Sequence, residues 1–336
     1  LNMQSKHSIE KQTAHYVDCF TTVSEITNNE CKELLDKPAD VVLMNGFEDD
    51  FVPKGATFTG KRKRARSTML RVANCLLGED LGDDTLIIGT SGRYEFKNKG
   101  IDVFLESLNR LNRDKDLKKK VLAFVNVPSW VGDPREDLQK RLKSKDKFTE
   151  PLQCPFITHW LHNMTHDQVL DMLKYLGMGN RPEDKVKVIF VPCYQDGHDG
   201  ILNKHYYDLI LGEDLSVYPS YYEPWGYTPL ESVAFRVPTI TTDLAGFGLW
   251  VNSLKNQHGI DDGVEVLHRS DYNYSEVADG IKDTVALFST KTEAEIKEIR
   301  KRAGQVAEQA LWKHFIKYYY EAYDIALCNA MKRQLR

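Results

Sequence analysis

The sequence has few cysteines, and they form no recognisable framework. Its six cysteines are scattered along 336 residues, and no two have the spacing of a CxxC motif. This distribution excludes the dense disulfide scaffold that staples a small secreted domain. We therefore expect reduced thiols and a cytoplasmic location.

Long apolar runs are also missing. No stretch approaches the roughly 20 apolar residues that a membrane-spanning helix requires, and the opening residues LNMQSKHSIEKQ lack the apolar core of a signal peptide. The sequence therefore predicts no membrane partner. The chain begins at Leu1 and opens into a helical pattern, so we expect it to be a piece of a longer protein.

Neither sign of charge is in large excess. Forty-five Lys and Arg residues against 49 Asp and Glu residues leave a formal charge of −4, which predicts no global attraction for nucleic acid. The exception is GKRKRAR (60–66), where no aromatic residues are interleaved with the basic ones. That run favours a solvated helix start over a nucleic-acid contact. An anionic ligand must therefore be held by local charges.

From residue 83 onward, apolar strands alternate with amphipathic helices. The predicted strands are 85–91, 120–128, 186–192, 215–220 and 238–243, and the predicted helices are 100–112, 166–177, 204–213 and 228–236. This order predicts an α/β fold, with a doubly wound, Rossmann-like parallel sheet whose ligand lies at the carboxyl ends of the strands. The GxGxxG spacing is missing, which disfavours a dinucleotide-dependent dehydrogenase.

The two ends of the chain carry further predicted elements. Residues 8–36 predict two helices with Ser24 as the cap of the second, and residues 40–47 predict a short buried strand. The last 45 residues predict helix. An aromatic and aliphatic stripe on that helix is typical of core packing, and it comprises Trp312, Phe315, Ile316, Tyr319 and Tyr323.

The stretch YPSYYEPWGYTPLESVAF (218–235) contains two glutamates on either side of a rigid corner. Thr228, Pro229 and Glu231 fit the N-cap, N1 and N3 positions of the following helix. This spacing predicts a capping box, which is a sufficient structural explanation of Glu231.

The first part of the same stretch is harder to explain structurally. Glu223 follows a buried strand, where an unpaired carboxylate is costly, so it either bonds to loop amides or serves a ligand. Gly226 and Tyr227 would present free amides at the positive end of the helix, which is a natural phosphate site. Together these features favour a sugar that bears a phosphate leaving group.

The glycine-rich turn GTSGRYEFKNKG (89–100) supplies two cations at the carboxyl end of a predicted strand. Arg93 offers a planar fork and Lys99 a point charge, a pair that suits a diphosphate whose negative charge grows as its bond to sugar breaks. The structural alternative is that both cations are simply solvated. Both readings stay open on spacing alone.

Two histidine-containing segments were weighed as metal sites. His159, His162 and His166 lack a nearby carboxylate or cysteine ligand set, so polar or packing roles are favoured and no metal is assigned. DGHDG (196–200) is similarly typical of a turn.

Several long segments in one order resemble the eukaryotic-type glycogen synthases, glycosyltransferase family 3. They are AHYVDCFTTVSEIT (14–27), SGRYEFKNKG (91–100), YPSYYEPWGYTPLE (218–231) and VPTITTDLAGFG (237–248), and the likeness extends to ALWKHFIKYYYEA near the carboxyl end. The resemblance covers most of the chain.

The resemblance implies the two-domain glycosyltransferase B fold. It implies retaining transfer of glucose from UDP-glucose, or from ADP-glucose, to the 4-hydroxyl of an α-1,4-glucan. It implies neither a metal nor a cofactor beyond the donor, and a homo-oligomer is a further expected assembly.

The resemblance also implies roles for individual residues. Arg93 and Lys99 match the pair that binds the donor diphosphate. Glu223 matches the first glutamate of an E-x7-E motif, which faces the donor glucose as nucleophile or as stabiliser of oxocarbenium-like charge. Glu231 matches the second, which holds the nucleotide ribose. The turn at the phosphates corresponds to Gly226, Tyr227 and Thr228.

The resemblance further implies a domain division. Residues 1–55 correspond to the end of an amino-terminal acceptor-side domain, 56–310 to the nucleotide-sugar-binding domain, and 311–336 to a carboxyl-terminal helix that packs back toward the first. Family members carry a dense arginine cluster for glucose 6-phosphate on a late helix. The matching segment here, 295–309, has only Lys297, Arg300, Lys301 and Arg302.

Two other functions share this fold. A non-catalytic nucleotide- or glucan-binding module would bind nucleotide without transferring glucose, and the retained Glu223 speaks against it. A phosphorylase-like enzyme would need a lysine that forms a Schiff base with pyridoxal phosphate.

Overall fold

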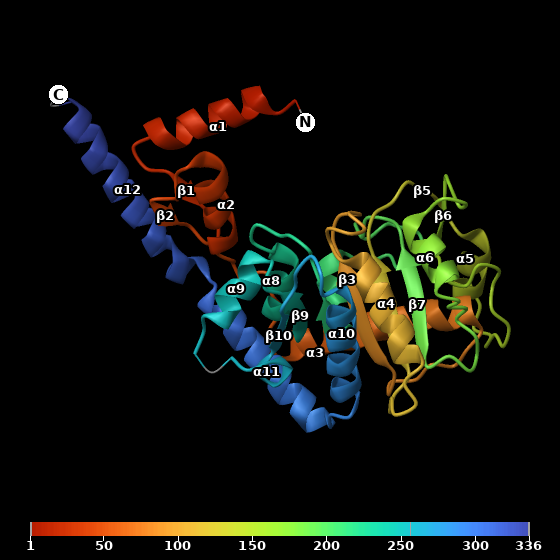
Figure 1. Cartoon of the computed structure of the whole chain (residues 1–336). Coiled ribbons are helices and arrows are strands. Elements are labelled where there is room, and N and C mark those ends of the chain that lie inside the picture. Colours follow the sequence, from red (N-terminus) through yellow and green to blue (C-terminus); the bar gives the residue numbers. More distant parts are fainter. Residues whose placement is uncertain (1, 256, 335–336) are drawn as a thin grey trace.

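The computed structural model describes residues 2–255 and 257–334. Its centre is a six-stranded parallel sheet in the order β10-β9-β8-β3-β4-β7 (Figure 1). The strands are β3 (Leu86–Ser91), β4 (Val121–Asn126), β7 (Val186–Val191), β8 (Leu215–Val217), β9 (Thr239–Thr242) and β10 (Val264–Leu267). The first strand lies in the middle, two strands follow on one side, and three follow on the other. This is the doubly wound order that the sequence predicted.

Helices cover both faces of this sheet. They are α3 (Gly55–Leu77), α4 (Ile101–Asn112), α5 (Glu136–Lys143), α6 (Gln168–Tyr175), α7 (Tyr206–Ile210), α8 (Tyr227–Ala234), α9 (Gly246–Asn252), α10 (Tyr274–Ser289) and α11 (Glu293–Gln309). Along β3, Leu86 and Ile88 pack in the cluster of α4 and α10, whereas Ile87 packs in the cluster of α3 and α5. Because successive strand residues point to opposite faces, a nearly continuous apolar run is what a sheet buried on both sides requires.

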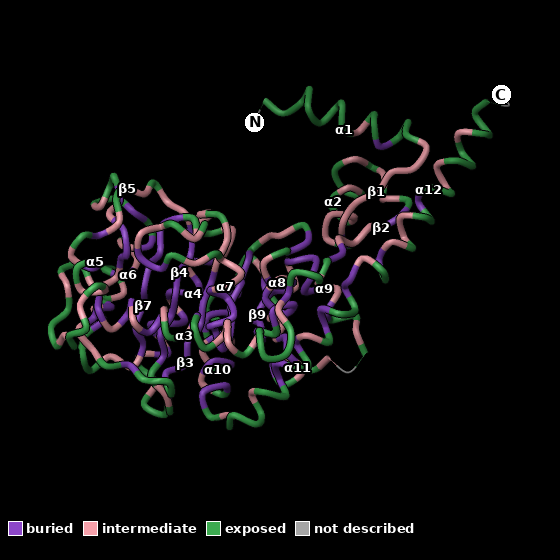
Figure 2. Tube along the Cα trace, turned by 180° about the vertical axis from the view of Figure 1, so that it is seen from behind, coloured by how far each residue is buried: buried purple, intermediate pink, exposed green. Residues whose placement is uncertain are grey.

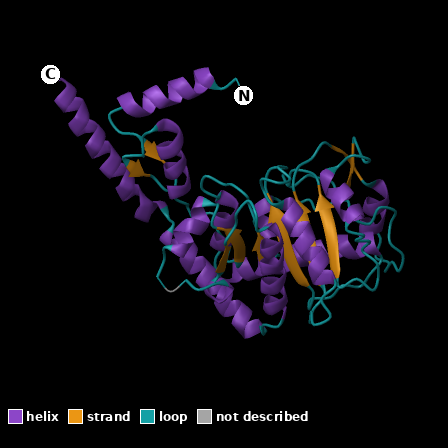
Figure 3. Cartoon of the chain, viewed as in Figure 1, coloured by secondary structure: helices purple, strands orange, loops and turns teal. Residues whose placement is uncertain are grey.

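A smaller substructure lies beside the main sheet (Figures 1 and 3). It consists of α1 (Gln4–Tyr16), α2 (Glu25–Leu35) and a two-stranded parallel sheet of β1 (Thr21–Thr22) and β2 (Val41–Val42). Ser24 caps α2 as predicted, with its hydroxyl accepting the Thr27 amide. The predicted strand 40–47 is shorter than expected, since the chain leaves β1 after Leu43 donates to Thr22 O at 2.7 Å.

The last helix, α12 (Trp312–Gln334), packs against this substructure. Phe47 donates to Ala310 O at 3.0 Å, and Arg333 near its end pairs with Asp18 at 2.7 Å. The division into domains 1–55, 56–310 and 311–336 stays a prediction.

The predicted core stripe on α12 is only partly correct. Phe315 is buried, Trp312 and Tyr319 are half-buried, and Tyr323 is exposed. The physical reason is that the second half of the helix extends beyond the main body, where few elements cover it (Figure 2).

The basic run 60–66 is only partly the solvated helix segment that was predicted, since Lys63 and Arg64 are exposed but other members of the run are engaged. It lies inside α3, where Arg62 and Arg66 pair with the two oxygens of Asp214 at 2.5 and 2.6 Å. Their remaining donors bind the carbonyls of Leu211 and Thr85. Burial pushes the pKa of Asp214 up, but the two guanidinium groups outweigh it and hold that pKa below its usual value. The two arginines therefore tie α3 to the residues that precede β3 and β8.

Several elements were not predicted, namely the outer strand β10, helices α9 and α10, and a hairpin of β5 (Val131–Pro134) and β6 (His159–Leu161). No helix in the described part of the chain is both long enough and apolar enough to cross a membrane.

Candidate active site

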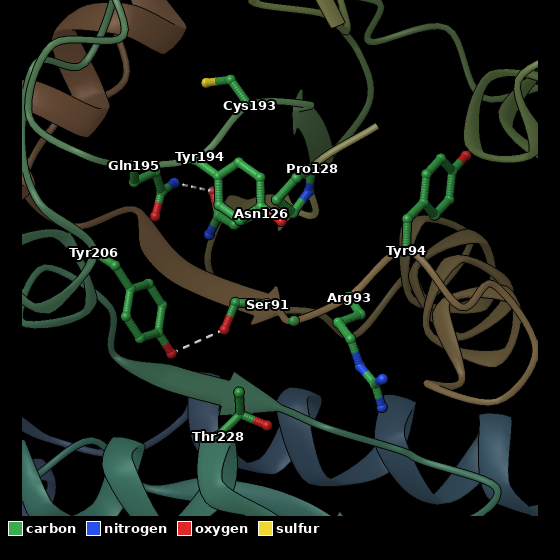
Figure 4. Close-up of a pocket in the computed structure, with 11 residues that line it drawn as sticks. Ser91, Arg93, Tyr94, Asn126, Pro128, Cys193, Tyr194, Gln195, Tyr206 and Thr228 are labelled. Carbon is green, nitrogen blue, oxygen red and sulfur yellow. Dashed lines mark hydrogen bonds between the residues drawn. The ribbon is translucent and has the colours of Figure 1, made fainter. Parts of the chain in front are cut away.

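A hollow of about 330 Å³ opens at the carboxyl edge of the sheet (Figure 4). Its lining comes from the ends of β3, β4 and β7 and from α7 and α8. The end of β3 is also where the chain order reverses toward β8, which is the usual ligand site of a doubly wound sheet. Ser91 ends β3 and Asn126 ends β4, directly opposite each other in register. Tyr206 enters from α7 and Thr228 from α8. The predicted location of the site at the strand ends is therefore matched by a real cavity.

Arg93 lines this hollow. It follows β3 in the turn that leads to α4, its side chain is 76% exposed, and its Nε pairs with Glu95 at 3.1 Å. Among the described lining residues it is the only lysine, arginine, aspartate or glutamate. An exposed guanidinium with one weak partner can be redirected toward an anion at little cost.

Lys99 and Glu223 meet although 124 residues separate them in the sequence. The Nζ of Lys99 pairs with Oε2 of Glu223, and the two side chains are only 15% and 17% exposed. Gly100, which follows Lys99, adopts a left-handed conformation with φ 66° and caps α4, and a Cβ there would collide with Pro219 O. The tight passage of the chain at Gly100 holds the lysine beside the corner that carries Glu223.

The corner at Glu223 is fixed by backbone bonds. Glu223 donates to Leu244 O at 3.0 Å, and its own carbonyl accepts from Gly246 at 3.1 Å. Trp225 is buried against Phe247. Because the backbone is held on both sides, the carboxylate of Glu223 projects from a rigid support. Its partner is Lys99 and not the loop amides that were weighed as the structural alternative.

The predicted capping box at TPLE is wrong. Helix α8 begins at Tyr227 with Gly226 as its N-cap at φ 107°, so Thr228 already lies inside the helix. Only a glycine tolerates that backbone conformation easily, and this cap starts the helix two residues earlier than a threonine cap at position 228 would. Among the described residues, the amides of Gly226, Tyr227 and Thr228 find no acceptor. These free donors point out of the positive end of α8.

Glu231 has a different partner from the one predicted. Its Oε1 accepts the hydroxyl of Tyr207 at 2.8 Å. Burial raises the pKa of Glu231, and the Tyr207 bond offsets part of that rise. Tyr207 is itself stacked on Phe235, with ring centroids 5.1 Å apart and an angle of 4° between the planes. The second glutamate is thus held in place from the side of α7.

Several residues that line the hollow were not predicted from the sequence. They are Ser91, Tyr94, Asn126, Pro128, Cys193, Tyr194, Gln195 and Tyr206. A usable signal was present, since most of them lie at or just after the carboxyl ends of the predicted strands 85–91, 120–128 and 186–192. Figure 4 shows Gln195 bonded to Asn126, at 2.8 Å, and Ser91 bonded to the hydroxyl of Tyr206, at 2.9 Å.

The histidines that were weighed as metal ligands are engaged otherwise or exposed. His159 lies within ligand distance of Cys193 and Asp199. However, its Nε2 faces the carbonyl of Asp199 at 2.7 Å and its Nδ1 faces Thr158 Oγ1 at 2.9 Å. Burial raises the pKa of the Cys193 thiol to about 12. With both ring nitrogens bonded and the thiol protonated, this cluster is typical of packing. The segment 196–200 forms the predicted turn, in which Asp199 accepts the amides of Ile201 and Leu202.

An Asp–His pair at the same edge of the sheet gives a pH-dependent prediction. Asp243 follows β9 and His268 follows β10, and Oδ2 of Asp243 lies 2.6 Å from Nδ1 of His268. This hydrogen bond and the carboxylate charge raise the pKa of His268 above 6.5. The folded pKa therefore exceeds the unfolded one, so the pair stabilises the fold below the unfolded pKa, and that contribution disappears as pH rises through the raised value.

An NMR titration of the His268 ring checks this directly. We expect Asp243→Asn to bring the pKa of His268 back toward 6.5, because the asparagine keeps its contact with the Arg269 amide but loses the charge. An unchanged pKa of His268 in the variant would show that Asp243 is not the cause.

The fold and the site can now be compared with known proteins. Residues 2–140 and 131–336 match the family model described as glycogen synthase. The chain belongs to the glycogen synthase family. It is 28% identical to the glycogen [starch] synthase of Neurospora crassa, over 97% of this chain and 54% of that protein. It is 29% identical to glycogen [starch] synthase isoform 2 of Saccharomyces cerevisiae, over 98% of this chain and 56% of that protein. It is 27% identical to the human liver glycogen [starch] synthase, over 97% of this chain and 54% of that protein. The chain thus spans about half the length of these curated relatives.

Solved structures confirm the fold. A sucrose-phosphate synthase from Thermosynechococcus elongatus superimposes with a TM-score of 0.53 at 16% identity, over 100% of this chain and 63% of that one. Anabaena HepE, solved in complex with UDP and glucose, superimposes with a TM-score of 0.55 at 15% identity, over 96% of this chain and 66% of that one. Both are similar in fold alone. The predicted glycosyltransferase B class, with a Rossmann-like doubly wound sheet, is confirmed for this member of the family.

Proposed function

We propose that this chain is the donor-binding part of a glycogen synthase. The complete protein would transfer glucose from UDP-glucose to the 4-hydroxyl of an α-1,4-glucan with retention of configuration. The observation that carries the proposal is the set of anion-binding groups at this edge of the sheet. Arg93 and Thr228 line the hollow, and the Lys99–Glu223 pair lies beside Gly226 at the start of α8.

The charges of the site suit a nucleotide diphosphate sugar. Arg93 and Lys99 are cations, and the unpaired amides of residues 226–228 add the positive end of a helix. Negative charge grows on the diphosphate as its bond to glucose breaks, and these groups stabilise it without moving far. The donor chemistry therefore needs no metal from the protein, and we propose that none is bound.

The walls of the hollow suit the nucleoside. Tyr194 is an exposed ring beside the cavity, on which a base can stack, and Asn126 and Gln195 offer amides to its polar edge. The carboxylate of Glu231, held by Tyr207, is an acceptor for ribose hydroxyls. These groups do not by themselves distinguish uracil from adenine, and we propose the uridine nucleotide on the family relationship.

Lys99 forms an ion pair with Glu223 and neutralises its charge. We propose that donor binding draws the ammonium group toward the diphosphate, which leaves the Glu223 carboxylate facing the glucose. A negative group at that position stabilises positive charge that develops on the sugar ring as the leaving group departs.

A calorimetric titration with UDP and ADP tests the donor site on the chain as it exists. We expect saturable UDP binding, and we expect Arg93→Ala to raise the Kd about 10- to 100-fold, because a charge-assisted hydrogen bond contributes roughly 1.5–3 kcal/mol. Arg64→Ala is the matched control, since Arg64 is an exposed arginine on α3 and not in the hollow.

Two results would contradict the proposal. One is equal UDP affinity in wild type and Arg93→Ala, and the other is the absence of any nucleotide binding. If UDP does bind at Arg93, glucose transfer is measured next, with this chain joined to the segment that precedes the matching region in a full-length relative. Nucleotide binding without transfer in that longer protein would identify a non-catalytic module.

A further inference from the structure

We propose that a second hollow, next to the nucleotide pocket, anchors an α-1,4-glucan chain on the indole of Trp130. The choice of glucan rests on the proposed function, whereas the site itself rests on the geometry of the β5–β6 hairpin. The hollow has a volume of about 190 Å³, which is comparable to the size of one sugar ring.

The hairpin brings two rings together at its open end. Trp130 directly precedes β5 and His162 directly follows β6, and in the antiparallel pair Val131 is opposite Leu161. His162 donates to Trp130 O at 3.1 Å, and the two ring centroids lie 5.1 Å apart. The indole is nevertheless 70% exposed. A large aromatic ring is thus held out in solvent by its neighbours.

The base of the hairpin is rigid. Arg135 is completely buried and donates to the carbonyls of Gln153, Cys154 and Ile157, while its other face contacts the ring of Trp160 at 4.6 Å. It also pairs with Asp137 at 2.6 Å. Because these bonds fix both strands, the position of Trp130 is set before any ligand arrives, which lowers the entropic cost of binding.

The wall beside Trp130 offers free polar groups. Among the described residues, the side chains of His166 and Gln168 and the Nδ2 group of Asn163 make no hydrogen bond, and all three line the hollow. Asp167 keeps its carboxylate on the amides of Val169 and Leu170 as the cap of α6. The hollow therefore combines one apolar platform with several neutral donors and acceptors.

This combination favours a sugar over a phosphate or a nucleic acid. The described lining contains no lysine or arginine but includes the carboxylate of Asp167, which repels anions. The face of an indole carries negative charge density and attracts the polarised C–H groups of a pyranose, while amides bind its hydroxyl groups. A neutral, polyhydroxylated ligand satisfies both halves of the site.

The position of the hollow links it to the proposed reaction. Tyr94 lines this hollow and also the nucleotide pocket, and Figure 4 shows it at the edge of that pocket. The Tyr94 hydroxyl accepts a hydrogen bond from the Val169 amide at 3.0 Å, which holds the tyrosine ring in place between the two hollows. A glucan bound at Trp130 would lie beside the donor site without occupying it, which keeps the polymer close between transfers.

Titration of the chain with maltoheptaose, followed by NMR of the backbone amides around the hollow, tests the site in wild type and variants alike. For one exposed sugar subsite we expect a Kd on the order of 1 mM in wild type. Trp130→Ala should raise that Kd about tenfold or more, because a tryptophan platform dominates such a contact, and Trp130→Phe should retain most of the affinity. Tyr175→Ala is the control, since Tyr175 is an even more exposed aromatic residue at the far end of α6.

The same samples are titrated with UDP to separate this proposal from the donor function. Loss of maltoheptaose binding in Trp130→Ala, with UDP affinity unchanged, supports the site. It is overturned if the variant binds maltoheptaose like wild type, or if wild type shows no binding at about 10 mM. Equal binding of a β-1,4-linked oligosaccharide would overturn the assignment to α-1,4-glucan. If UDP binds to no sample but maltoheptaose binding depends on Trp130, the donor function fails and the sugar site stands.

Discussion

Replacing Asp214 with asparagine should lower the free energy of unfolding by about 3–5 kcal/mol, because it removes a buried carboxylate that pairs with two partly buried arginines. Arg62 and Arg66 pair with Asp214, and Arg300 is buried nearby with its Nη1 on Glu213 O. Asp214 also accepts the Ile87 amide at 2.9 Å, at the start of the central strand. Without the negative charge, the two arginines stay partly buried with backbone carbonyls as acceptors but with no carboxylate to neutralise them.

Urea-induced unfolding measures this effect. Asp208→Asn is the matched control, since Asp208 pairs with Lys61 of the same helix α3 at 2.8 Å but both side chains are 38% exposed. A pair so accessible to solvent contributes about 0–1 kcal/mol. Equal destabilisation by the two substitutions would refute the idea that burial of the Asp214 network is what matters.

Replacing Glu223 with glutamine should reduce kcat about 10²- to 10³-fold in a full-length protein that contains this chain. The effect follows from the proposed role of the carboxylate, which stabilises charge present in the transition state and not in the bound donor. The KM for the donor should change little. In the chain alone, UDP affinity should stay the same or increase, because Lys99 is released from its ion pair with Glu223.

Steady-state kinetics separate the two effects. A loss of kcat without a change in KM identifies a group that acts in the transition state, whereas an equal effect on donor affinity would indicate a binding role only. Glu276→Gln serves as the control, because Glu276 is an exposed glutamate on α10. A fully active Glu223→Gln enzyme would remove Glu223 from the mechanism.

Much of the sheet could be predicted because its strands are buried on both faces. Segments such as 85–91 and 186–192 are mostly apolar, and the helices between them repeat apolar residues every three or four positions. Strand β10 escaped notice because three of its four residues are only half-buried at the edge of the sheet. The β5–β6 hairpin was missed because its strands are short and one contains Pro134.

The corner at residues 223–231 shows where local rules misled. Threonine, proline and glutamate at the right spacing predicted a capping box, yet Gly226 caps the helix and Glu231 bonds to Tyr207. A local pattern cannot anticipate a tyrosine that arrives from another helix. The basic run 60–66 was misread for the same reason, because its partner Asp214 is 148 residues away from Arg66.

The sequence by itself determined the alternation of strands and helices, the family, and the residue types at the carboxyl ends of the strands. These features follow from local periodicity and from motifs that are continuous in the chain. Only the tertiary structure decided that Lys99 meets Glu223, that Tyr207 holds Glu231, and that the hollow of Trp130 shares Tyr94 with the hollow of Arg93. Each of these contacts depends on the order of the strands in the sheet, which brings distant loops to one edge and which no local pattern encodes.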